Sequence, residues 1–187
     1  MGRGPIAGPV VAGAVVLPDL HGFTHEDLPL LRDSKTLTAN QIERANQFVR
    51  EIAVGIGIGE VDNREIDRIG IAPAVRKAMR RALEQLAEPP DHVLVDAFAF
   101  DWRRKPCTAV VKGDARCTAI AAASIVAKAH RDAAMRRLAR RYPGYGLGSH
   151  KGYASAGHLA AVASLGPSPA HRLSFSPFKP VLFARDG

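Results

Sequence analysis

The segment from Val110 to Asp132 constrains the fold most, because it joins a short apolar run, a glycine turn and a long alanine-rich stretch. Ala, Ile, Lys and Arg at this density favour helix, and neither Gly nor Pro occurs from Ala115 to Tyr142. Asp114 is therefore expected where a strand passes into a helix. A carboxylate there either caps the helix N-terminus or belongs to a site, and both interpretations stay open at this point.

A second carboxylate upstream favours the site. Asp96 ends a short apolar run, and open α/β sheets place their chemistry at the carboxyl ends of strands. The helix after Asp114 also carries Ser124, Lys128 and Asp132 four residues apart. This polar stripe either supports an active site or consists of a simple Lys128–Asp132 ion pair.

The remaining segments complete an α/β pattern. Apolar runs predict strands at 10–17, 52–60, 92–96 and 109–111. Amphipathic segments predict helices at 39–50, the first capped by Thr38, and at 71–87, and a further helix is expected at about 156–165. With 187 residues, 47% of them hydrophobic, the chain suits one globular domain with a sizeable core.

The charge balance favours a polyanionic partner, although a solvated basic face explains it equally well. Lys plus Arg exceed Asp plus Glu by 26 − 18 = 8, and Asp186 is the one acidic residue after Tyr142. Cys107 and Cys117 lack metal-ligand spacing and predict free thiols in a reducing cytosol. No apolar run approaches the roughly 20 residues of a membrane helix, so we expect a cytoplasmic protein without a membrane partner.

Three short segments present polar groups. Gly2–Pro9 predicts a tight glycine loop whose backbone N–H groups can reach a hydroxyl or a phosphate. Lys35, in the run Asp-Ser-Lys, is either a phosphate contact or a surface lysine. Near the C-terminus, His171 suits packing better than a site.

Taken in chain order, the segments GRGPIAGPVV, DSK, VDAF, KGDA, IAAASIVAKAHRD, YPGYG, HKGY and HR-L-SF resemble the type 2 ribonuclease H family, ribonuclease HII. The resemblance extends from Gly2 to about Phe178. It implies an α/β, ribonuclease H-like fold, in which helices flank a mixed five-stranded sheet and a helical extension follows. The first strand of that sheet is expected to be largely missing from this sequence. We accordingly expect a single domain, with a catalytic core at 1–142 and an extension and tail at 143–187.

The resemblance also implies an activity, the hydrolysis of the RNA strand of RNA–DNA hybrids and incision at single ribonucleotides embedded in duplex DNA. The products carry 5′-phosphate and 3′-hydroxyl ends, and the enzyme is expected to act as a monomer. Such chemistry uses two divalent ions, Mg²⁺ or Mn²⁺, held by carboxylates about 3.5–4 Å apart. Asp96 and Asp114 match two of the four family carboxylates and are the expected catalytic metal ligands.

The other two family carboxylates, an Asp-Glu pair, are expected immediately before Met1, at the end of the first strand. We favour a start that is assigned too late. The alternative is a chain that begins here, a non-catalytic hybrid-binding remnant whose two carboxylates hold metal weakly. Loss of the first strand would also expose unpaired backbone groups of its neighbours.

Recognition of the sugar follows from the same resemblance. The backbone of Gly2, Arg3 and Gly4 resembles the loop that recognises the ribose 2′-hydroxyl, the group that distinguishes RNA from DNA. Tyr153 matches the tyrosine that stacks on the deoxyribose after the ribonucleotide. Without the HKGY context, a surface tyrosine would be the simpler interpretation.

Backbone contacts to the nucleic acid are expected from basic side chains. Lys35, Lys151 and Arg172 are the expected phosphate contacts, which give salt-dependent affinity without sequence preference. Asp132 is expected to support the site or pair within its helix rather than to bind metal.

Overall fold

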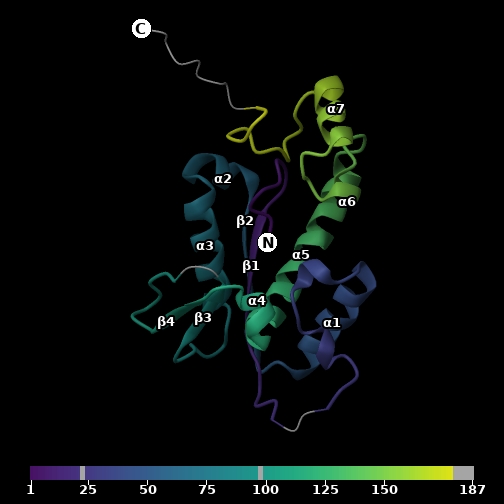
Figure 1. The fold of residues 1–187 in the computed structure, drawn as a ribbon. Coiled ribbons are helices and arrows are strands. Elements are labelled where there is room, and N and C mark those ends of the chain that lie inside the picture. Colours follow the sequence, from purple (N-terminus) through teal and green to yellow (C-terminus); the bar gives the residue numbers. More distant parts are fainter. Residues whose placement is uncertain (22–23, 97–98, 179–187) are drawn as a thin grey trace.

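The computed structural model describes residues 1–21, 24–96 and 99–178 (Figure 1). The strands in these ranges are β1 (Val10–Val16), β2 (Gly55–Val61), β3 (Val93–Asp96) and β4 (Cys107–Val110). The α-helices are α1 (Ala39–Ile52), α2 (Asn63–Ile69), α3 (Ile71–Glu84), α4 (Gly113–Arg116), α5 (Thr118–Arg141), α6 (Leu147–His150) and α7 (Ala156–Leu165). Two 3-10 turns, Leu28–Leu30 and Ser34–Thr36, precede α1. Residues 97–98 of the VDAF segment and the expected tail beyond Phe178 lie outside the described residues.

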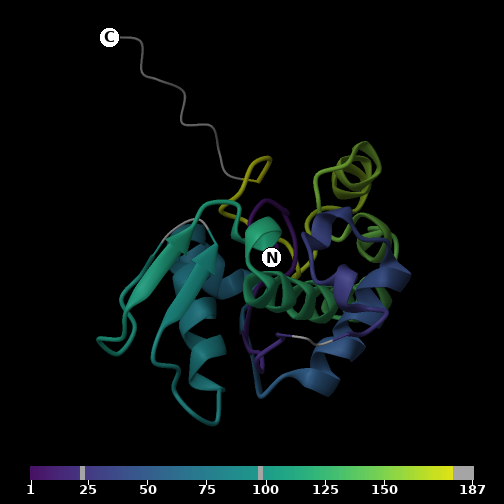
Figure 2. The same cartoon turned by 60° about the horizontal axis from the view of Figure 1, so that its bottom comes forward.

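The strands pair in two separate sheets. β1 and β2 run antiparallel, with Val10 opposite Val61, whereas β3 and β4 run parallel, with Val93 opposite Cys107. Figure 2 shows the β3–β4 sheet on one side of α5 and α1 on the other. A cavity of about 610 Å³, lined by β1 and β3, lies between the sheets. The described residues thus form four strands in two sheets, and the five-stranded sheet, whose first strand was expected to be largely missing here, stays a prediction.

Helices cover both faces of the β1–β2 sheet. A Cβ atom added to Gly59 of β2 would lie 1.8 Å from the carbonyl oxygen of Ala78 in α3. One added to Gly13 of β1 would lie 2.3 Å from the carbonyl oxygen of Ala123 in α5. These strands carry glycine because a helix backbone packs directly on them. The strand predicted at 52–60 begins only at Gly55, since α1 continues to Ile52.

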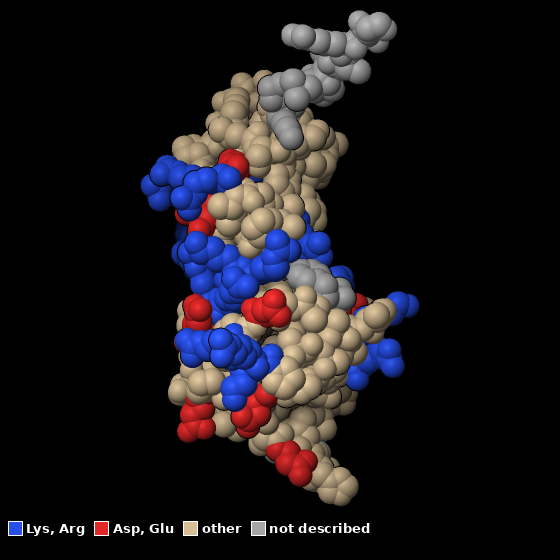
Figure 3. All heavy atoms as spheres, turned by 90° about the vertical axis from the view of Figure 1, so that its left-hand side faces the viewer, with Lys and Arg blue, Asp and Glu red and all other residues tan. Residues whose placement is uncertain are grey.

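The outer surface beside this sheet is basic. Figure 3 shows a face on which Lys and Arg side chains gather over α2 and α3. Exposed arginines on these helices are Arg64, Arg68, Arg76 and Arg80. The amphipathic helix predicted at 71–87 is therefore confirmed as α3, with an apolar face on the strands and a basic face outward.

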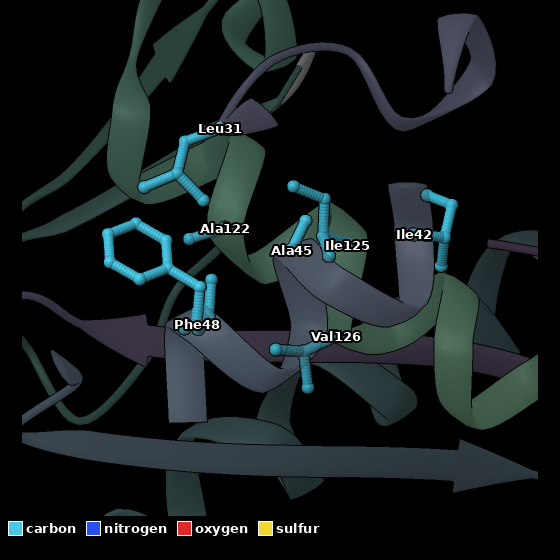
Figure 4. Packing of buried hydrophobic residues seen from close by; sticks show 8 residues of the cluster. Leu31, Ile42, Ala45, Phe48, Ala122, Ile125 and Val126 are labelled. Atoms are coloured by element: carbon cyan, nitrogen blue, oxygen red, sulfur yellow. The ribbon is translucent and has the colours of Figure 1, made fainter. Parts of the chain in front are cut away.

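The largest apolar cluster lies between α1 and α5. Ile42 and Phe48 of α1 pack toward Ile125 of α5 (Figure 4), and burial of each such side chain contributes about 1.5–3 kcal/mol. α1 begins as predicted, because the Thr38 hydroxyl accepts the N–H of Gln41 at 3.3 Å. The Gln41 side chain accepts the N–H of Thr38 in return, at 2.9 Å.

The helix predicted to run unbroken after Asp114 is divided. Cys117 is extended, with φ −135° and ψ 116°, and separates α4 from α5. Its N–H closes α4 on the carbonyl oxygen of Gly113, and its own carbonyl accepts the N–H of Ala121 in α5. Asp114 lies within α4, whose N-cap is Lys112, so it is not the helix cap that one interpretation allowed. Cys107 and Cys117 are free, half-buried thiols, as predicted.

The residues after α5 return to the N-terminal loop. The N–H of Gly8 donates to the carbonyl oxygen of Ala170 at 2.9 Å, and that of Arg172 donates to Ile6 at 2.8 Å. His171, between these two bonds, forms an isolated β-bridge with Ala7. Among the helices of the described residues, none has both the length and the apolar character needed to cross a bilayer.

Candidate active site

Asp96 and Asp114 follow two parallel strands. β3 ends at Asp96, and its partner β4 ends at Val110, shortly before Asp114. Because parallel strands bring their carboxyl ends to the same edge, the chain leaving β4 enters α4 beside Asp96. The Oδ1 atom of Asp96 accepts the N–H of Gly113 at 3.0 Å, which ties the strand end to the first turn of α4.

Asp114 is buried and faces a positive charge. Its Oδ2 atom accepts a hydrogen bond from Lys35 Nζ at 2.9 Å, and Lys35 Nζ also lies 3.6 Å from Asp33 Oδ1. The hydrogen bond to Asp114 is the main cause that raises the pKa of Lys35 above its ordinary value. The Lys35 side chain is 67% exposed but the Asp114 side chain only 10%, so Lys35 can leave this carboxylate only when another cation takes its place.

One cavity connects the candidate site residues. Asp96 and Asp114 both line the cavity between the two sheets, and so do Gly2, Gly4 and Tyr153. The two expected metal ligands and the expected sugar-reading groups thus lie along one cavity, whose other lining residues are mostly apolar.

The metal-ligand set is partial. Within residues 1–21, 24–96 and 99–178, no group of three or more Asp, Glu, His or Cys side chains suits a metal ion. Asp96 and Asp114 offer the oxygen atoms that a hard divalent ion prefers, but they fill only part of a shell of about six ligands. The expected Asp-Glu pair lies before Met1, outside the given sequence, and stays a prediction.

The polar stripe of α5 does not extend the ligand set. Lys128 Nζ donates to both carboxylate oxygens of Asp132, at 2.7 and 2.6 Å, so the ion-pair interpretation is correct. Ser124 shares a hydrogen bond of 2.7 Å with Ser34, which fastens the turn before α1 onto α5.

Arg172 shapes the Gly2–Pro9 loop from the inside. Its side chain is fully buried, and burial lowers its pKa to about 9. At 2.8 to 3.2 Å, the guanidinium donates to the carbonyl oxygens of Gly2, Arg3, Pro5 and Gly8. The expectation of a phosphate contact is therefore corrected, because a buried guanidinium that these carbonyls engage does not reach a phosphate at the surface.

A second buried arginine holds the same loop and was missed in the sequence. Arg131 of α5 donates from Nε to the carbonyl oxygen of Pro9 at 3.1 Å and from Nη2 to that of Lys151 at 3.0 Å. Burial lowers its pKa. Its position could have indicated this role, because Arg131 lies four residues from Ala127 and from Met135, on the buried face of the helix. A charged side chain on such a face must have hydrogen-bond partners.

Tyr153 lies beside the glycine loop. A Cβ atom added to Gly4 would lie 3.8 Å from Tyr153 Cε1, and Tyr153 is 53% exposed. Lys151 precedes it in the left-handed region, with φ 52°, and its Nζ donates to the carbonyl oxygen of Gly148. Burial lowers the pKa of this lysine. His171 is buried, in agreement with the expected packing role.

Solved structures with this fold are ribonucleases H. The ribonuclease H2 of Pyrococcus horikoshii OT3 gives a TM-score of 0.76, covering 95% of this chain and 92% of its own, at 25% identity. Bst-RNase HIII in complex with Mn²⁺ gives a TM-score of 0.71, covering 95% of this chain and 65% of its own, at 20% identity. At this identity the similarity supports the fold alone. The fold and the strand-end carboxylates define a metal-dependent nuclease of the ribonuclease H class.

The sequence comparisons specify the family within this class. The family description Ribonuclease HII matches residues 1–177. A ribonuclease HII from Geobacter sulfurreducens is 47% identical, covering 93% of this chain and 78% of its own length. The chain belongs to the ribonuclease HII family, whose members are endonucleases that cleave the RNA strand of RNA–DNA hybrids. The family and the fold class inferred from the order of motifs are therefore confirmed.

Proposed function

We propose that this protein incises duplex DNA at single embedded ribonucleotides, in addition to cleaving the RNA strand of hybrids. The reaction uses two divalent ions, Mg²⁺ or Mn²⁺, and leaves 5′-phosphate and 3′-hydroxyl ends. The observation that carries this proposal is one cavity lined by Asp96, Asp114, the Gly2–Gly4 loop and Tyr153. Metal ligands and sugar-reading groups must act on the same nucleotide, so the presence of both along one cavity supports this function.

Asp96 and Asp114 would hold the ions from one side of the cavity. When bound, divalent ions lower the pKa of an attacking water and offset the charge on the leaving 3′-oxygen. The N–H of Gly113 fixes one oxygen of Asp96 and leaves its second oxygen for a cation. Lys35 neutralises the buried Asp114 and would turn to a neighbouring phosphate when the ions take its place.

The Gly2–Gly4 backbone would recognise the ribose 2′-hydroxyl. The carbonyl oxygens of Gly2 and Arg3 point toward the buried Arg172. In a trans peptide the next N–H points the opposite way, so the N–H groups of Arg3 and Gly4 point away from that guanidinium. A 2′-hydroxyl can accept from such N–H groups, whereas a deoxyribose leaves them without this partner.

Tyr153 would stack on the deoxyribose that follows the ribonucleotide. Its ring is half exposed and lies beside Gly4, so the loop and the ring can contact neighbouring sugars of one strand. This pairing makes the site a sensor of the junction between ribose and deoxyribose.

Basic groups would attract and align the duplex. Lys35 and Lys151 are proposed phosphate contacts near the cavity, and the exposed arginines of α2 and α3 add long-range attraction (Figure 3). Contacts of this kind weaken with salt and carry no sequence preference.

We further infer one domain, with a catalytic core at 1–142 and an extension and tail at 143–187, that acts as a monomer in the cytoplasm. The described part of the extension packs back on the N-terminal loop through Ala170 and Arg172, which supports a single folding unit. The free, half-buried thiols of Cys107 and Cys117 suit a reducing compartment.

A non-catalytic hybrid-binding protein is the second candidate function. It is favoured by one observation, the lack of a third clustered carboxylate among the described residues. Binding of a hybrid needs the loop, Tyr153 and the basic surface, but not a complete metal shell.

Incision assays separate the two candidates. The substrate is a duplex with one ribonucleotide, offered with Mg²⁺ or Mn²⁺ to residues 1–187 and to the same chain extended upstream by the whole first strand with its Asp-Glu pair. We expect the extended chain to incise on the 5′ side of the ribonucleotide, and the shorter chain to bind with turnover lower by roughly a thousandfold or more. An all-DNA duplex is the control.

Two outcomes would contradict this account. Equal turnover by both chains would show that the Asp-Glu pair is not needed. An extended chain that cleaves hybrids and ignores the single ribonucleotide would remove the junction-reading part of the proposal.

A further inference from the structure

Two buried histidines connect Tyr153 to the C-terminal segment. His158, in the first turn of α7, and His171 are almost inaccessible to solvent, and their Nε2 atoms lie 3.0 Å apart. The Nδ1 atom of His158 lies 2.8 Å from the carbonyl oxygen of Tyr153. The Nδ1 atom of His171 lies 2.9 Å from the backbone nitrogen of Ser168.

The partners at each end fix the protons along this chain. A backbone N–H can only donate, so Ser168 makes His171 Nδ1 an acceptor and puts the ring proton on Nε2. His171 then donates to His158 Nε2, which leaves the proton of His158 on Nδ1, aimed at the carbonyl oxygen of Tyr153. The longer contact of His171 Nδ1 with the Ser168 carbonyl oxygen, 3.2 Å, is not needed, because that oxygen accepts the N–H of His171 at 3.0 Å.

The chain requires both rings to be neutral, and their surroundings provide this. Burial lowers the pKa of His158 and of His171, and the nearby His150 lowers both further. His150 stacks on His158 with 4.2 Å between ring centroids, and Tyr145 is tilted on His171 at 5.1 Å. The next residue along the chain, Arg172, adds a buried positive charge.

We propose that His158 is a positioning residue for Tyr153, held in the required tautomer by His171 and Ser168. The Tyr153 ring is half exposed, so its place over the cavity depends on how its backbone is held. The carbonyl oxygen of Tyr153 accepts from His158 and from the N–H of Ser155, at 2.8 Å each. This inference rests on the proposed role of Tyr153 in reading the nucleotide junction.

The same chain couples the two parts of the sugar-reading site. His171 is followed directly by Arg172, which holds the carbonyl oxygens of Gly2 and Arg3. The dipeptide His171-Arg172 therefore fixes the position of Tyr153 through His158, and that of the glycine loop through the Arg172 guanidinium. In the proposed function, the distance between Tyr153 and the glycine loop must match one nucleotide step. The His171-Arg172 dipeptide helps to determine this distance.

Nitrogen-15 spectra of the histidine rings test the proton assignment independently of nucleic acid. With residues 1–187 at pH 7.5, we expect His171 as the Nε2–H tautomer and His158 as the Nδ1–H tautomer. The Nδ1–H form is the less favoured tautomer of the histidine side chain in water, so its presence in His158 is diagnostic. A His158 ring protonated on Nε2 would overturn the proposal whether or not the protein reads ribonucleotides.

Binding to a duplex with one ribonucleotide tests the positioning role. We expect His158→Leu to raise the Kd of residues 1–187 about tenfold, the scale of one lost hydrogen bond, and His158→Asn, whose amide N–H replaces Nδ1–H, to stay within about twofold. In a Tyr153→Ala background, His158→Leu should add nothing. His130→Leu, which removes a histidine paired only with Glu60, is the matched control.

The outcomes are distinguishable. Equal losses from His158→Leu with and without Tyr153 would mean that His158 acts on general stability and would overturn the positioning role. If His158→Leu fails to fold, the decision passes to His158→Asn, where a tenfold loss contradicts the proposal. A Tyr153→Ala variant that binds like the parent chain would refute the proposed function of Tyr153, while the tautomer result would still stand.

Discussion

At the scale of single residues, Arg172 links parts of the chain that lie 170 positions apart, since its Nη2 donates to the carbonyl oxygen of Gly2. A guanidinium suits this task because its five N–H donors spread in a plane and reach several carbonyls together. A lysine in the same place has one nitrogen and reaches fewer of them. The glycine loop therefore depends on the shape of this side chain as well as on its charge.

Arg172→Lys is expected to lower the free energy of unfolding by about 2–4 kcal/mol, because it leaves buried carbonyls unsatisfied. Urea unfolding followed by circular dichroism measures this difference. Arg76→Lys, on the exposed face of α3, is the control and should change the stability by less than about 0.5 kcal/mol. Equal stabilities of the two variants would show that the loop does not need the guanidinium.

The sequence predicted residue types at the site better than residue roles. Asp96 and Asp114 were expected from strand ends, and the structure brings both to one cavity. Arg172 was recognised by its motif, but a motif does not tell whether an arginine faces a phosphate or a buried set of carbonyls. Arg131 was missed because its partners, Pro9 and Lys151, lie far from it in the chain.

At the scale of elements, close contact between helix and strand decides where glycine is required. Gly59 has no room for a Cβ atom beside the carbonyl of Ala78, whereas Gly157, in the first turn of α7, has nothing within 4 Å of an added Cβ. The same substitution should therefore have opposite effects at the two positions.

Gly59→Ala is expected to destabilise the fold by about 1–3 kcal/mol, because α3 must shift away from β2. Gly157→Ala is expected to stabilise it by about 0.5–1 kcal/mol, because alanine lowers the backbone entropy of the unfolded chain. Thermal unfolding of both variants measures the contrast. A Gly59→Ala protein as stable as the parent would contradict the direct packing of α3 on β2.

Local signals predicted elements well and their interruptions poorly. The capping box at Thr38 and the helix at 156–165 were expected from short-range patterns and are observed. The break at Cys117, where the backbone is extended, was not expected, because the residues around it favour helix. The alternating glycines at 55–59 predicted a strand. The reason for the glycines could not be predicted, because α3, which packs on them, lies elsewhere in the chain.

At the scale of the whole molecule, the site forms where separate parts of the fold meet. β3 and α4 supply the carboxylates, the N-terminal loop supplies the glycines, and the segment after α5 supplies Tyr153 and Arg172. The order of motifs predicted this fold class, and the strands of the described residues pair in two separate sheets. Strand pairing depends on residues distant in sequence, so no local pattern reports it.

The central claim is that Asp96 and Asp114 share divalent ions, and a Mn²⁺ titration followed by electron paramagnetic resonance tests it most directly. The chain extended upstream by the first strand and its Asp-Glu pair is compared with its Asp96→Asn and Asp114→Asn variants. Asp91→Asn is the control for a fully exposed carboxylate, paired with Lys105. We predict that each site variant binds Mn²⁺ at least about tenfold more weakly and loses incision while it still binds the duplex, and that Asp91→Asn matches the parent. Parent-like Mn²⁺ affinity and turnover in Asp96→Asn or Asp114→Asn would contradict the account.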